Sequence, residues 1–492
     1  MRYEPHELPY ETRSICPDCL LEDGVVNVVD ATIHETGRGV VMTKSCPEHG
    51  DFEEVVWSDA ALYERSMERW YRSVGTLNPG ADSVRGCPLD CGLCPEHRSH
   101  TALAIIDVTS RCNLSCPICF ASSKTTGSVY EPSPEEVRAM MTAFRKSRPV
   151  PCPGIQFAGG EPTLSENLVD YVRWAKELGF DHVMVATNGV RFAEDAGYVK
   201  TLVQAGLNTV YLQFDGVSEG PYIAARGIDL REVKRRAIDG CREAGLDGVI
   251  LVPTVVGGVN DGELGEIVRF GLNNTDVVKC INFQPVSFTG RIDKRERGKM
   301  RVTIPDVIKR IEEQTGGLVK VGDWYPISSM LPLGRALGLI KGRPEVELSA
   351  HPACGMATFL VLEDGRPRPI TDLVDVEGFL DALEDVCNLY ARGSVFKGLR
   401  SRLRLGRALR GVRGQLLGRL LGSLLEQGDY GSLASFMDEV LMLGMMHFMD
   451  PWNYDMERAS HCDIHYGTPD GRMVPFCNYN MFYRKEVEGR HG

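Results

Sequence analysis

The sequence predicts an α/β protein built on a parallel sheet with outer helices, preceded by a cysteine-rich module and followed by an α-rich region. Between residues 101 and 290, six short apolar runs alternate with five amphipathic patterns of helical period. Repeats of this length are typical of β-α units, which assemble into a parallel sheet. Nine of the 16 cysteines precede residue 120, which indicates a separate metal-binding module over residues 1–100. Residues 291–492 form the expected α-rich region with further cluster ligands.

The expected elements of the central region follow from periodicity and turn residues. The strands are expected at 102–108, 155–157, 182–186, 209–214, 248–256 and 280–285. The helices between them are expected at 133–146, 166–178, 195–205, 230–244 and 262–272. Ser133 and Glu136 have the spacing of a capping box, so we expect a helix to begin there.

The composition narrows the class of protein. A chain of 492 residues with 43% hydrophobic and 25% charged residues is typical of a soluble globular protein of two or three domains. Its net charge of -12 argues against nucleic acid as the main partner. No apolar run is long enough for a transmembrane helix, and the N-terminus lacks the apolar core of a signal peptide. We therefore expect a cytoplasmic protein.

The N-terminal module contains two knuckles of metal-ligand spacing. Cys16 and Cys19 form the first, and Cys46 and His49 form the second. The pattern C-x2-C…C-x2-H is typical of zinc ribbons and rubredoxin-like sites. Iron and zinc both accept such tetrahedral sites, so the sequence does not choose the metal. Either His49 or a later cysteine is the fourth ligand.

Two later loops share the spacing C-x3-C-x2-C. Cys112, Cys116 and Cys119 directly follow the expected strand 102–108. Three thiolates on one loop can hold three corners of a four-iron cluster and leave the fourth iron open, whereas structural clusters take four cysteines. This spacing therefore favours a reactive cluster over a structural one. The alternative is a zinc knuckle. The earlier loop, with Cys87, Cys91 and Cys94, lacks a preceding strand. We interpret it as an auxiliary cluster site, or alternatively as part of the N-terminal metal site.

The C-terminal region contributes three more candidate ligands, Cys354, Cys462 and Cys477. The turn signal at 469–471 should bring Cys462 and Cys477 together across a hairpin. With Cys354, which follows His351 in a short turn, they suggest a second auxiliary site. The isolated Cys152, Cys241 and Cys280 are interpreted as buried core thiols.

The central motifs resemble the radical S-adenosylmethionine (SAM) superfamily. Its hallmarks here are the Cys112–Cys119 loop after one strand and Ala158-Gly159-Gly160-Glu161-Pro162 after the next. The resemblance implies a partial (β/α)6 barrel with SAM bound to the open iron of a four-iron cluster. Gly159, Gly160 and Glu161 would then lie along the methionine part of SAM, since glycines permit close approach. Polar residues at the strand ends would contact SAM or the substrate, namely Asn188, Gln213, Asp215 and Gln284.

Motifs outside the barrel resemble one branch of this superfamily. They are the segment around Cys87–His97 and the segment from Cys462 to Cys477. The branch contains the archaeal tetraether lipid synthase and was earlier linked to pterin methylation in methanopterin biosynthesis. The resemblance implies three 4Fe-4S clusters, one mononuclear iron or zinc, SAM, and a reductant such as ferredoxin or flavodoxin. It assigns no catalytic side chain.

The expected reaction begins with a 5′-deoxyadenosyl radical that takes hydrogen from an unactivated carbon. The main expectation from the resemblance is that two chain ends of ether lipids are joined by a C–C bond, with lipid as the substrate. The alternative is methylation of a pterin. Residues 396–426, rich in leucine and arginine, suggest either a packed helical hairpin or peripheral contact with anionic lipid headgroups.

Overall fold

The computed structural model describes residues 2–122, 129–363, 365–392 and 430–491, with scattered residues between 393 and 429. Most of the leucine- and arginine-rich stretch, including Arg402, Arg407 and Arg410, lies outside the described residues. Of its leucines, Leu417 and Leu421 are buried against the α-rich region. No described helix has the length and apolar character needed to cross a membrane.

The centre of the molecule is the predicted parallel sheet. Six of its strands lie side by side in chain order: β5 (Leu103–Thr109), β6 (Gly154–Gly159), β7 (His182–Thr187), β8 (Thr209–Gln213), β9 (Val249–Val252) and β11 (Val278–Pro285). The short β10 (Thr254–Val255) also pairs in parallel with β11. Each predicted strand is present within a few residues of its expected bounds, which confirms the α/β fold class.

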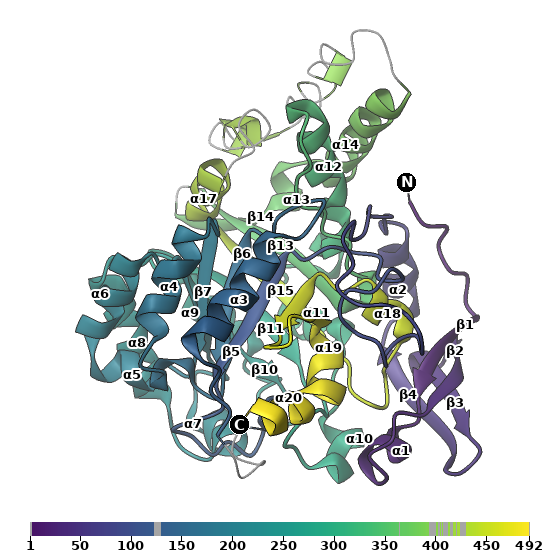
Figure 1. Cartoon of the computed structure of the whole chain (residues 1–492). Coiled ribbons are helices and arrows are strands. Elements are labelled where there is room, and N and C mark those ends of the chain that lie inside the picture. Colours follow the sequence, from purple (N-terminus) through teal and green to yellow (C-terminus); the bar gives the residue numbers. More distant parts are fainter. Residues whose placement is uncertain are drawn as a thin grey trace.

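Helices connect these strands and cover the outer face of the sheet, on the left of Figure 1. They are α3 (Pro134–Arg145), α4 (Leu168–Glu177), α6 (Ala196–Ala205), α8 (Arg231–Glu243) and α9 (Leu264–Leu272). The capping box of Ser133 and Glu136 is present at the start of α3. Two further short helices, α5 (Val190–Glu194) and α7 (Glu219–Arg226), were not predicted. At five and eight residues they are too short to show a clear helical period.

Strands from the C-terminal part of the chain extend this sheet at both edges. Beside β11 lie β15 (Val440–Met446), in parallel, and then β13 (Gly355–Glu363), antiparallel to β15. Beside β5 lies β16 (Ile464–Gly467), followed by β17 (Met473–Pro475). The predicted hairpin between Cys462 and Cys477 is therefore present. Strands beyond residue 290 thus belong to the same sheet, which places the C-terminal cysteines next to the parallel strands.

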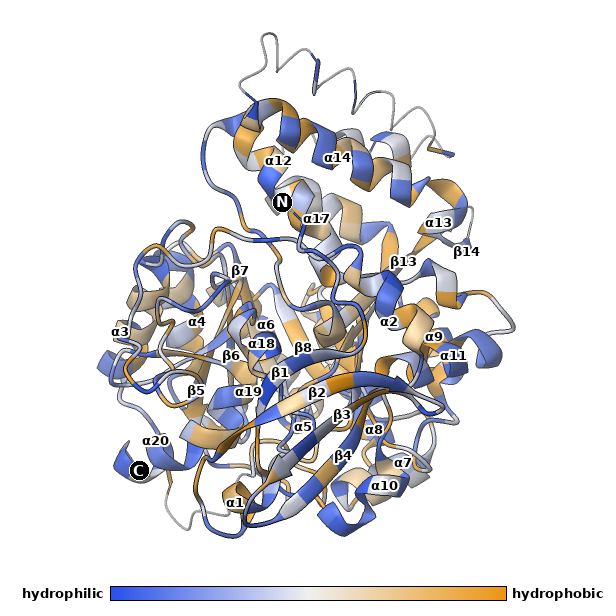
Figure 2. Ribbon diagram, turned by 90° about the vertical axis from the view of Figure 1, so that its right-hand side faces the viewer, coloured by the Kyte–Doolittle hydropathy of each residue, from blue (hydrophilic) through white to orange (hydrophobic). Residues whose placement is uncertain are grey.

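The N-terminal module is a small antiparallel sheet of β1 (Tyr10–Ile15), β2 (Val28–Thr36), β3 (Gly39–Cys46) and β4 (Gly50–Trp57). It lies on the right of Figure 1, away from α4 and α6, and faces the viewer in Figure 2. The short α1 (Pro17–Leu21) carries the first knuckle, and α2 (Ala60–Met67) follows the sheet.

The α-rich region lies at the top of Figure 1. Its main helices are α12 (Leu331–Lys341), α14 (Val376–Ala391) and α17 (Tyr430–Asp438), with α13 (Ile370–Leu373) and the short strands β12 (Tyr325–Pro326) and β14 (Arg366–Pro369). The remaining helices lie around the barrel: α10 (Arg297–Met300), α11 (Ile304–Gln314), α18 (Met456–Ser460), α19 (Phe476–Asn478) and α20 (Arg484–His491).

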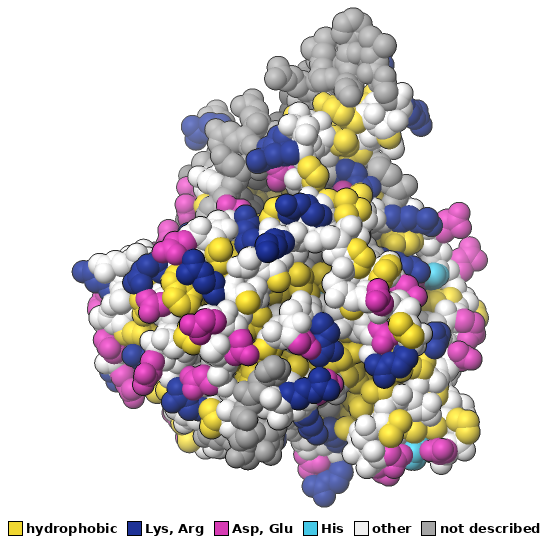
Figure 3. Space-filling model, in the orientation of Figure 1, with side chains coloured by type: hydrophobic (Ala, Val, Ile, Leu, Met, Phe, Trp, Pro, Cys, Tyr) yellow, Lys and Arg dark blue, Asp and Glu magenta, His cyan; other side chains and the backbone are white. Residues whose placement is uncertain are grey.

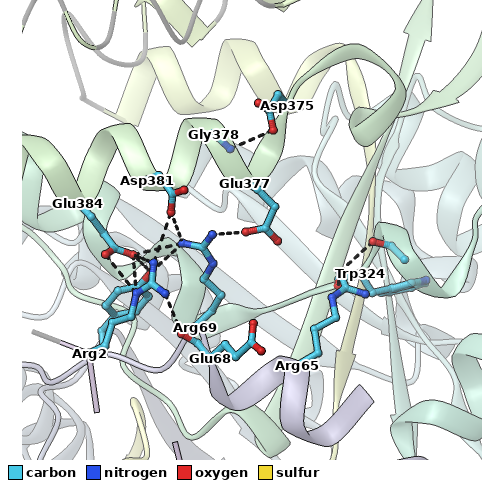
Figure 4. Close-up of polar contacts among 12 residues, drawn as sticks. Arg2, Arg65, Glu68, Arg69, Trp324, Asp375, Glu377, Gly378, Asp381 and Glu384 are labelled. Atoms are coloured by element: carbon cyan, nitrogen blue, oxygen red, sulfur yellow. Dashed lines mark hydrogen bonds and ion pairs between the residues drawn. The ribbon is translucent and has the colours of Figure 1, made fainter. Parts of the chain in front are cut away.

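An ion-pair network joins the N-terminal module to α14 (Figure 4). The Arg69 guanidinium lies 2.9 Å from an Asp381 oxygen and 3.2 Å from Glu384, and it also pairs with Glu377. Arg2 contacts Glu384 at 2.5 Å. Arg69 is largely buried, so these contacts are less screened by solvent than surface ion pairs. The network holds the module against the α-rich region.

Candidate active site and metal centres

The two N-terminal knuckles converge on one point. The Nδ1 atom of His49 lies 3.7 Å from Cys16 Sγ, 3.4 Å from Cys19 Sγ and 3.7 Å from Cys46 Sγ. The sulfurs of Cys19 and Cys46 are 3.8 Å apart. A tetrahedron with zinc bonds of about 2.3 Å to sulfur and about 2.0–2.1 Å to nitrogen has edges of about 3.8 and 3.6 Å. The four residues therefore fit a tetrahedral metal, and His49 rather than a later cysteine completes the set.

The loop that carries Cys112, Cys116 and Cys119 leaves the end of β5. Burial raises the pKa of the Cys112 thiol, and the adjacent thiols of Cys116 and Cys119 raise it further. All three side chains remain partly accessible. By contrast, Cys152, Cys241 and Cys280 are buried, as predicted. Three neighbouring, accessible thiols on one loop are what a cluster with an open iron requires.

Gly159 and Gly160 pack against the chain that leads into this loop. A Cβ atom on Gly159 would lie 2.2 Å from the Thr109 carbonyl oxygen, and one on Gly160 would lie 2.4 Å from that of Arg111. Gly159 also has a φ of +134°, which favours glycine. Both glycines thus approach the protein backbone closely. This contact sets the position of the cysteine loop relative to β6.

Glu161 is the centre of a buried hydrogen-bond network. Its Oε1 accepts hydrogen bonds from the hydroxyls of Thr163 and Thr187 at 2.6 and 2.7 Å. Its Oε2 accepts one from the Asn188 backbone N–H at 2.8 Å. The Asn188 side chain in turn donates to Asn113, inside the cysteine loop, at 2.6 Å. Glu161 and Asn188 therefore connect β6 and β7 to the loop.

Gln213 and Asp215, at the end of β8, contact two buried cations that the sequence did not single out. Lys234 Nζ donates to Gln213 Oε1 at 2.7 Å and to the Asn188 carbonyl at 2.6 Å. Burial lowers the pKa of Lys234 to about 7. Arg226 forms two 2.7 Å bonds to the carboxylate of Asp215, which is fully buried. In the sequence, Lys234 looks like an ordinary surface residue of the expected helix 230–244, and Arg226 lies outside every expected helix.

Arg226 also reaches the cysteine loop. Its NH1 donates to the Ile118 carbonyl at 2.8 Å, between Cys116 and Cys119. Burial opposes the charge of this guanidinium, but Asp215 outweighs it, so the pKa of Arg226 is raised. Gln284 stands apart from this group, since its amide donates to the Tyr211 hydroxyl at 2.7 Å. Asn188, Gln213 and Asp215 therefore gather around the loop, while Gln284 lies with Tyr211 and Asn282.

Cys87, Cys91 and Cys94 line a cavity of about 480 Å³. The Asn478 amide donates to Cys91 Sγ at 2.9 Å, and the Cys87 and Cys91 thiols are close enough to shift each other's pKa. Leu93 has a φ of +52°, a strained conformation for a branched side chain. Strain of this kind is characteristic of loops that are shaped for a function. None of the three cysteines is part of the N-terminal tetrad.

Cys354, Cys462 and Cys477 come together from three separate segments. Burial raises the pKa of Cys462, and the neighbouring Cys477 and Cys354 thiols raise it further. The Met449 backbone N–H donates to Cys477 Sγ at 3.3 Å. Asn478, which follows Cys477, contacts Cys91. The group of Cys354, Cys462 and Cys477 is therefore adjacent to the group of Cys87, Cys91 and Cys94.

A group of aromatic rings lies between the Cys112–Cys119 loop and Cys477. The rings of Phe448 and Phe476 are stacked with centroids 4.1 Å apart, and Phe120 lies 5.6 and 5.4 Å from them. All three are partly exposed. Phe120 directly follows Cys119, and Phe476 directly precedes Cys477. Apolar side chains gather in the middle of the face in Figure 3, where Figure 1 draws β5, β15 and α19.

Two family models match the chain. The radical SAM superfamily model matches residues 106–271, and a model described as the HMPTM N-terminal zinc ribbon domain matches residues 8–58. The second model covers the tetrad of Cys16, Cys19, Cys46 and His49.

Among characterised relatives, the 7,8-dihydro-6-hydroxymethylpterin dimethyltransferase of Methanocaldococcus jannaschii is 44% identical over 489 residues. The match covers 97% of this chain and 94% of the relative. A probable GTP 3′,8-cyclase of Methanothermobacter marburgensis is 30% identical over 186 residues, covering 38% of this chain and 59% of the relative. Among solved structures, Streptococcus suis SuiB bound to its precursor peptide SuiA has a TM-score of 0.35 at 15% identity, covering 44% of this chain and 46% of that one.

Proposed function

The chain belongs to the radical SAM superfamily and to the family of the Methanocaldococcus jannaschii pterin dimethyltransferase, and from this premise we propose that it methylates a pterin. The observation that carries the proposal is the 44% identity over nearly the whole of both chains. The match is long enough to include the ribbon, the barrel and the C-terminal cysteines together.

This relationship corrects the expectation of lipid coupling. The sequence motifs led to the prediction that lipid chain ends are joined, with lipid as substrate and partner. The near full-length relative is named for a pterin substrate and a methyl transfer, so that prediction is wrong and its alternative is supported. The motifs behind that prediction are specific for the branch of the superfamily and less so for the substrate.

The proposed cofactor site is the loop of Cys112, Cys116 and Cys119. When bound, a reduced 4Fe-4S cluster and SAM supply a 5′-deoxyadenosyl radical that takes hydrogen from an unactivated carbon. The chain's own residues orient this site: Glu161 fixes the end of β6, and Arg226 fixes the loop carbonyl of Ile118. We take Asn188 and Gln213 as contacts of SAM, since both lie in the network around the loop. A low-potential donor such as ferredoxin or flavodoxin supplies the electron.

The proposed substrate site is the group of Phe120, Phe448 and Phe476. A pterin is a planar bicyclic ring, and aromatic side chains bind such rings by offset or edge contacts. One of the three partly exposed rings, Phe120, directly follows Cys119. A pterin stacked on these rings would therefore lie beside the loop of Cys112, Cys116 and Cys119. We also propose auxiliary clusters on Cys87, Cys91 and Cys94 and on Cys354, Cys462 and Cys477.

The proposal is tested with the anaerobically reconstituted full chain, SAM and a chemical reductant. We expect 7,8-dihydro-6-hydroxymethylpterin to increase the rate at which 5′-deoxyadenosine forms, and to be consumed in step with it. Cys112→Ala serves as the control that lacks a complete cluster loop. A rate that is unchanged by the pterin, with no pterin consumed, would contradict the proposed substrate.

A further inference from the structure

This inference rests on the auxiliary cluster proposed above for Cys354, Cys462 and Cys477. That site has three cysteines, whereas a four-iron cluster that is fully held by protein has four ligands. The other cysteines of the chain belong to the zinc tetrad, to the two C-x3-C-x2-C loops, or to the core as single residues. A fourth protein ligand at this site would therefore not be a cysteine.

His447 lies on the segment that joins two of these cysteines. It directly follows β15, and its backbone N–H donates to the Cys354 carbonyl at 2.9 Å. The antiparallel ladder ends at the pair of Gly355 and Met446, and Cys354 and His447 are the next residues beyond this pair. His447 therefore lies directly beside Cys354. Two residues further on, the Met449 N–H contacts Cys477 Sγ at 3.3 Å.

The imidazole of His447 is buried without a partner. Its side chain is 2% exposed, and neither ring nitrogen has a hydrogen-bond partner among the residues that the structure describes. Buried polar groups of this kind are rare and costly, and a missing ion is one of their explanations. The charged groups that face it are Arg458, Arg301 and Asp450.

Of the other histidines near this site, His461 has both ring nitrogens engaged and His351 has one, because His351 Nε2 has no hydrogen-bond partner among the described residues. The His461 nitrogens contact the Glu457 carbonyl at 2.8 Å and the Tyr3 hydroxyl at 2.9 Å. In His351, Nδ1 accepts a hydrogen bond from the Ala353 N–H at 3.1 Å, and the ring packs edge-on against Trp70. Among these buried rings, His447 is the one with both nitrogens free.

We propose that His447 is the fourth protein ligand of the cluster held by Cys354, Cys462 and Cys477. The cluster then has no open iron, so it serves electron transfer rather than substrate binding. Replacement of an anionic thiolate by a neutral imidazole raises the reduction potential of an iron–sulfur centre. This inference is independent of the pterin, because it concerns only the ligands of one cluster.

The test is pulsed EPR of the reduced, reconstituted full chain without SAM, prepared with natural and with 15N-labelled histidine. We expect a nitrogen hyperfine coupling that changes with the histidine label. It should vanish in His447→Gln and persist in the matched controls His461→Gln and His351→Gln. Iron content in His447→Gln should fall by up to roughly one cluster. Zinc bound at the N-terminal tetrad reports that each variant is folded.

A second variant covers the case in which His447→Gln does not fold. His447→Cys supplies a thiolate at the same position, so we expect parental iron content, no histidine coupling and a lower midpoint potential. A label-sensitive coupling that persists in His447→Gln or His447→Cys would overturn the assignment. The absence of a label-sensitive coupling from the parent protein would also overturn the assignment. So would loss of the coupling in His351→Gln alone.

Discussion

At the residue scale, the cysteine loop is held by buried polar side chains whose partners are protein groups. Glu161 illustrates this, because its carboxylate accepts hydrogen bonds from Thr163, Thr187 and Asn188. Its side chain is 1% exposed. These hydrogen bonds fix the end of β6 relative to the loop.

Loss of a cysteine from the loop should remove the radical chemistry. We expect Cys116→Ala to bring SAM cleavage below detection, because a cluster with two protein ligands is labile. Cys112→Ala and Cys119→Ala should behave alike, whereas the buried Cys241→Ala should retain cleavage. The measurement is 5′-deoxyadenosine formed after reduction in the presence of SAM. Continued formation in any of the three loop variants would refute the ligand assignment.

Lys234 should make stability depend on pH. Burial lowers its pKa to about 7 in the folded protein, whereas a lysine in the unfolded chain titrates near about 10.4. Between these values the unfolded chain binds more protons, so stability rises with pH and the penalty of the buried charge is fully present below about pH 7. We expect the thermal midpoint to gain more between about pH 7 and about pH 9 in the parent than in Lys234→Met. Equal gains would show that Lys234 does not titrate in this range.

The sequence predicted the residues that bear chemistry better than those that position them. Cysteines at fixed spacing are visible in a sequence because the spacing itself is the signal. Lys234 is not, since a cation on an amphipathic helix usually faces water. Arg226 is not, since its short helix α7 shows no clear helical period. Only the fold shows that both point toward the strand ends, where Asn188, Gln213 and Asp215 neutralise or bond them.

At the scale of elements, the strands and helices of the barrel were predicted closely and the C-terminal strands were not. The helix α8 lies within its predicted bounds, because its apolar residues keep a clear helical period. By contrast, β15 and β13 join the parallel sheet from 70 residues or more beyond its last predicted strand, which ends at about residue 285. Such long-range pairing leaves no local pattern in the chain.

The ribbon of β1 to β4 should depend on its metal. One of four ligands is lost in His49→Ala, which should cost several of the roughly 10–16 kcal/mol of zinc binding. We therefore expect His49→Ala to lose zinc and to lower the thermal midpoint, while His49→Cys retains zinc. His34→Ala is the matched control, since His34 lies on β2 outside the tetrad. Full zinc content in His49→Ala, by elemental analysis, would count against the tetrad.

At the scale of the whole molecule, the fold brings the candidate metal ligands into four groups. The groups at Cys91 and Cys477 are adjacent through Asn478, and Ile15, next to Cys16 of the ribbon, packs in one cluster with Cys87 and Cys477. The rings of Phe448 and Phe476 lie between Cys477 and Phe120, next to the loop of Cys112, Cys116 and Cys119. The proposed substrate site therefore lies between the proposed radical source and a proposed auxiliary cluster.

The aromatic group should bind the substrate ring. We expect Phe476→Leu to raise the KM for the pterin by about 2- to 10-fold, because an aromatic contact contributes about 0.5–1.5 kcal/mol beyond area burial. SAM cleavage in the absence of pterin should be unchanged, which separates a binding effect from a damaged cluster. Phe436→Leu, in the α-rich region, is the control. An unchanged KM in Phe476→Leu would place the substrate elsewhere.

The central claim is that this chain transfers a methyl group to a pterin. The most direct measurement is mass spectrometry of 7,8-dihydro-6-hydroxymethylpterin after anaerobic incubation with the reconstituted chain, a reductant and SAM. SAM is here the methyl donor as well as the radical source: the hydrogen taken from the pterin leaves in 5′-deoxyadenosine, a second SAM supplies the methyl group, and the reductant supplies the electrons. We expect a pterin product that is heavier by one or two methyl groups and that is absent with Cys116→Ala. An unmodified pterin, in a reaction where SAM is cleaved to 5′-deoxyadenosine, would contradict the claim.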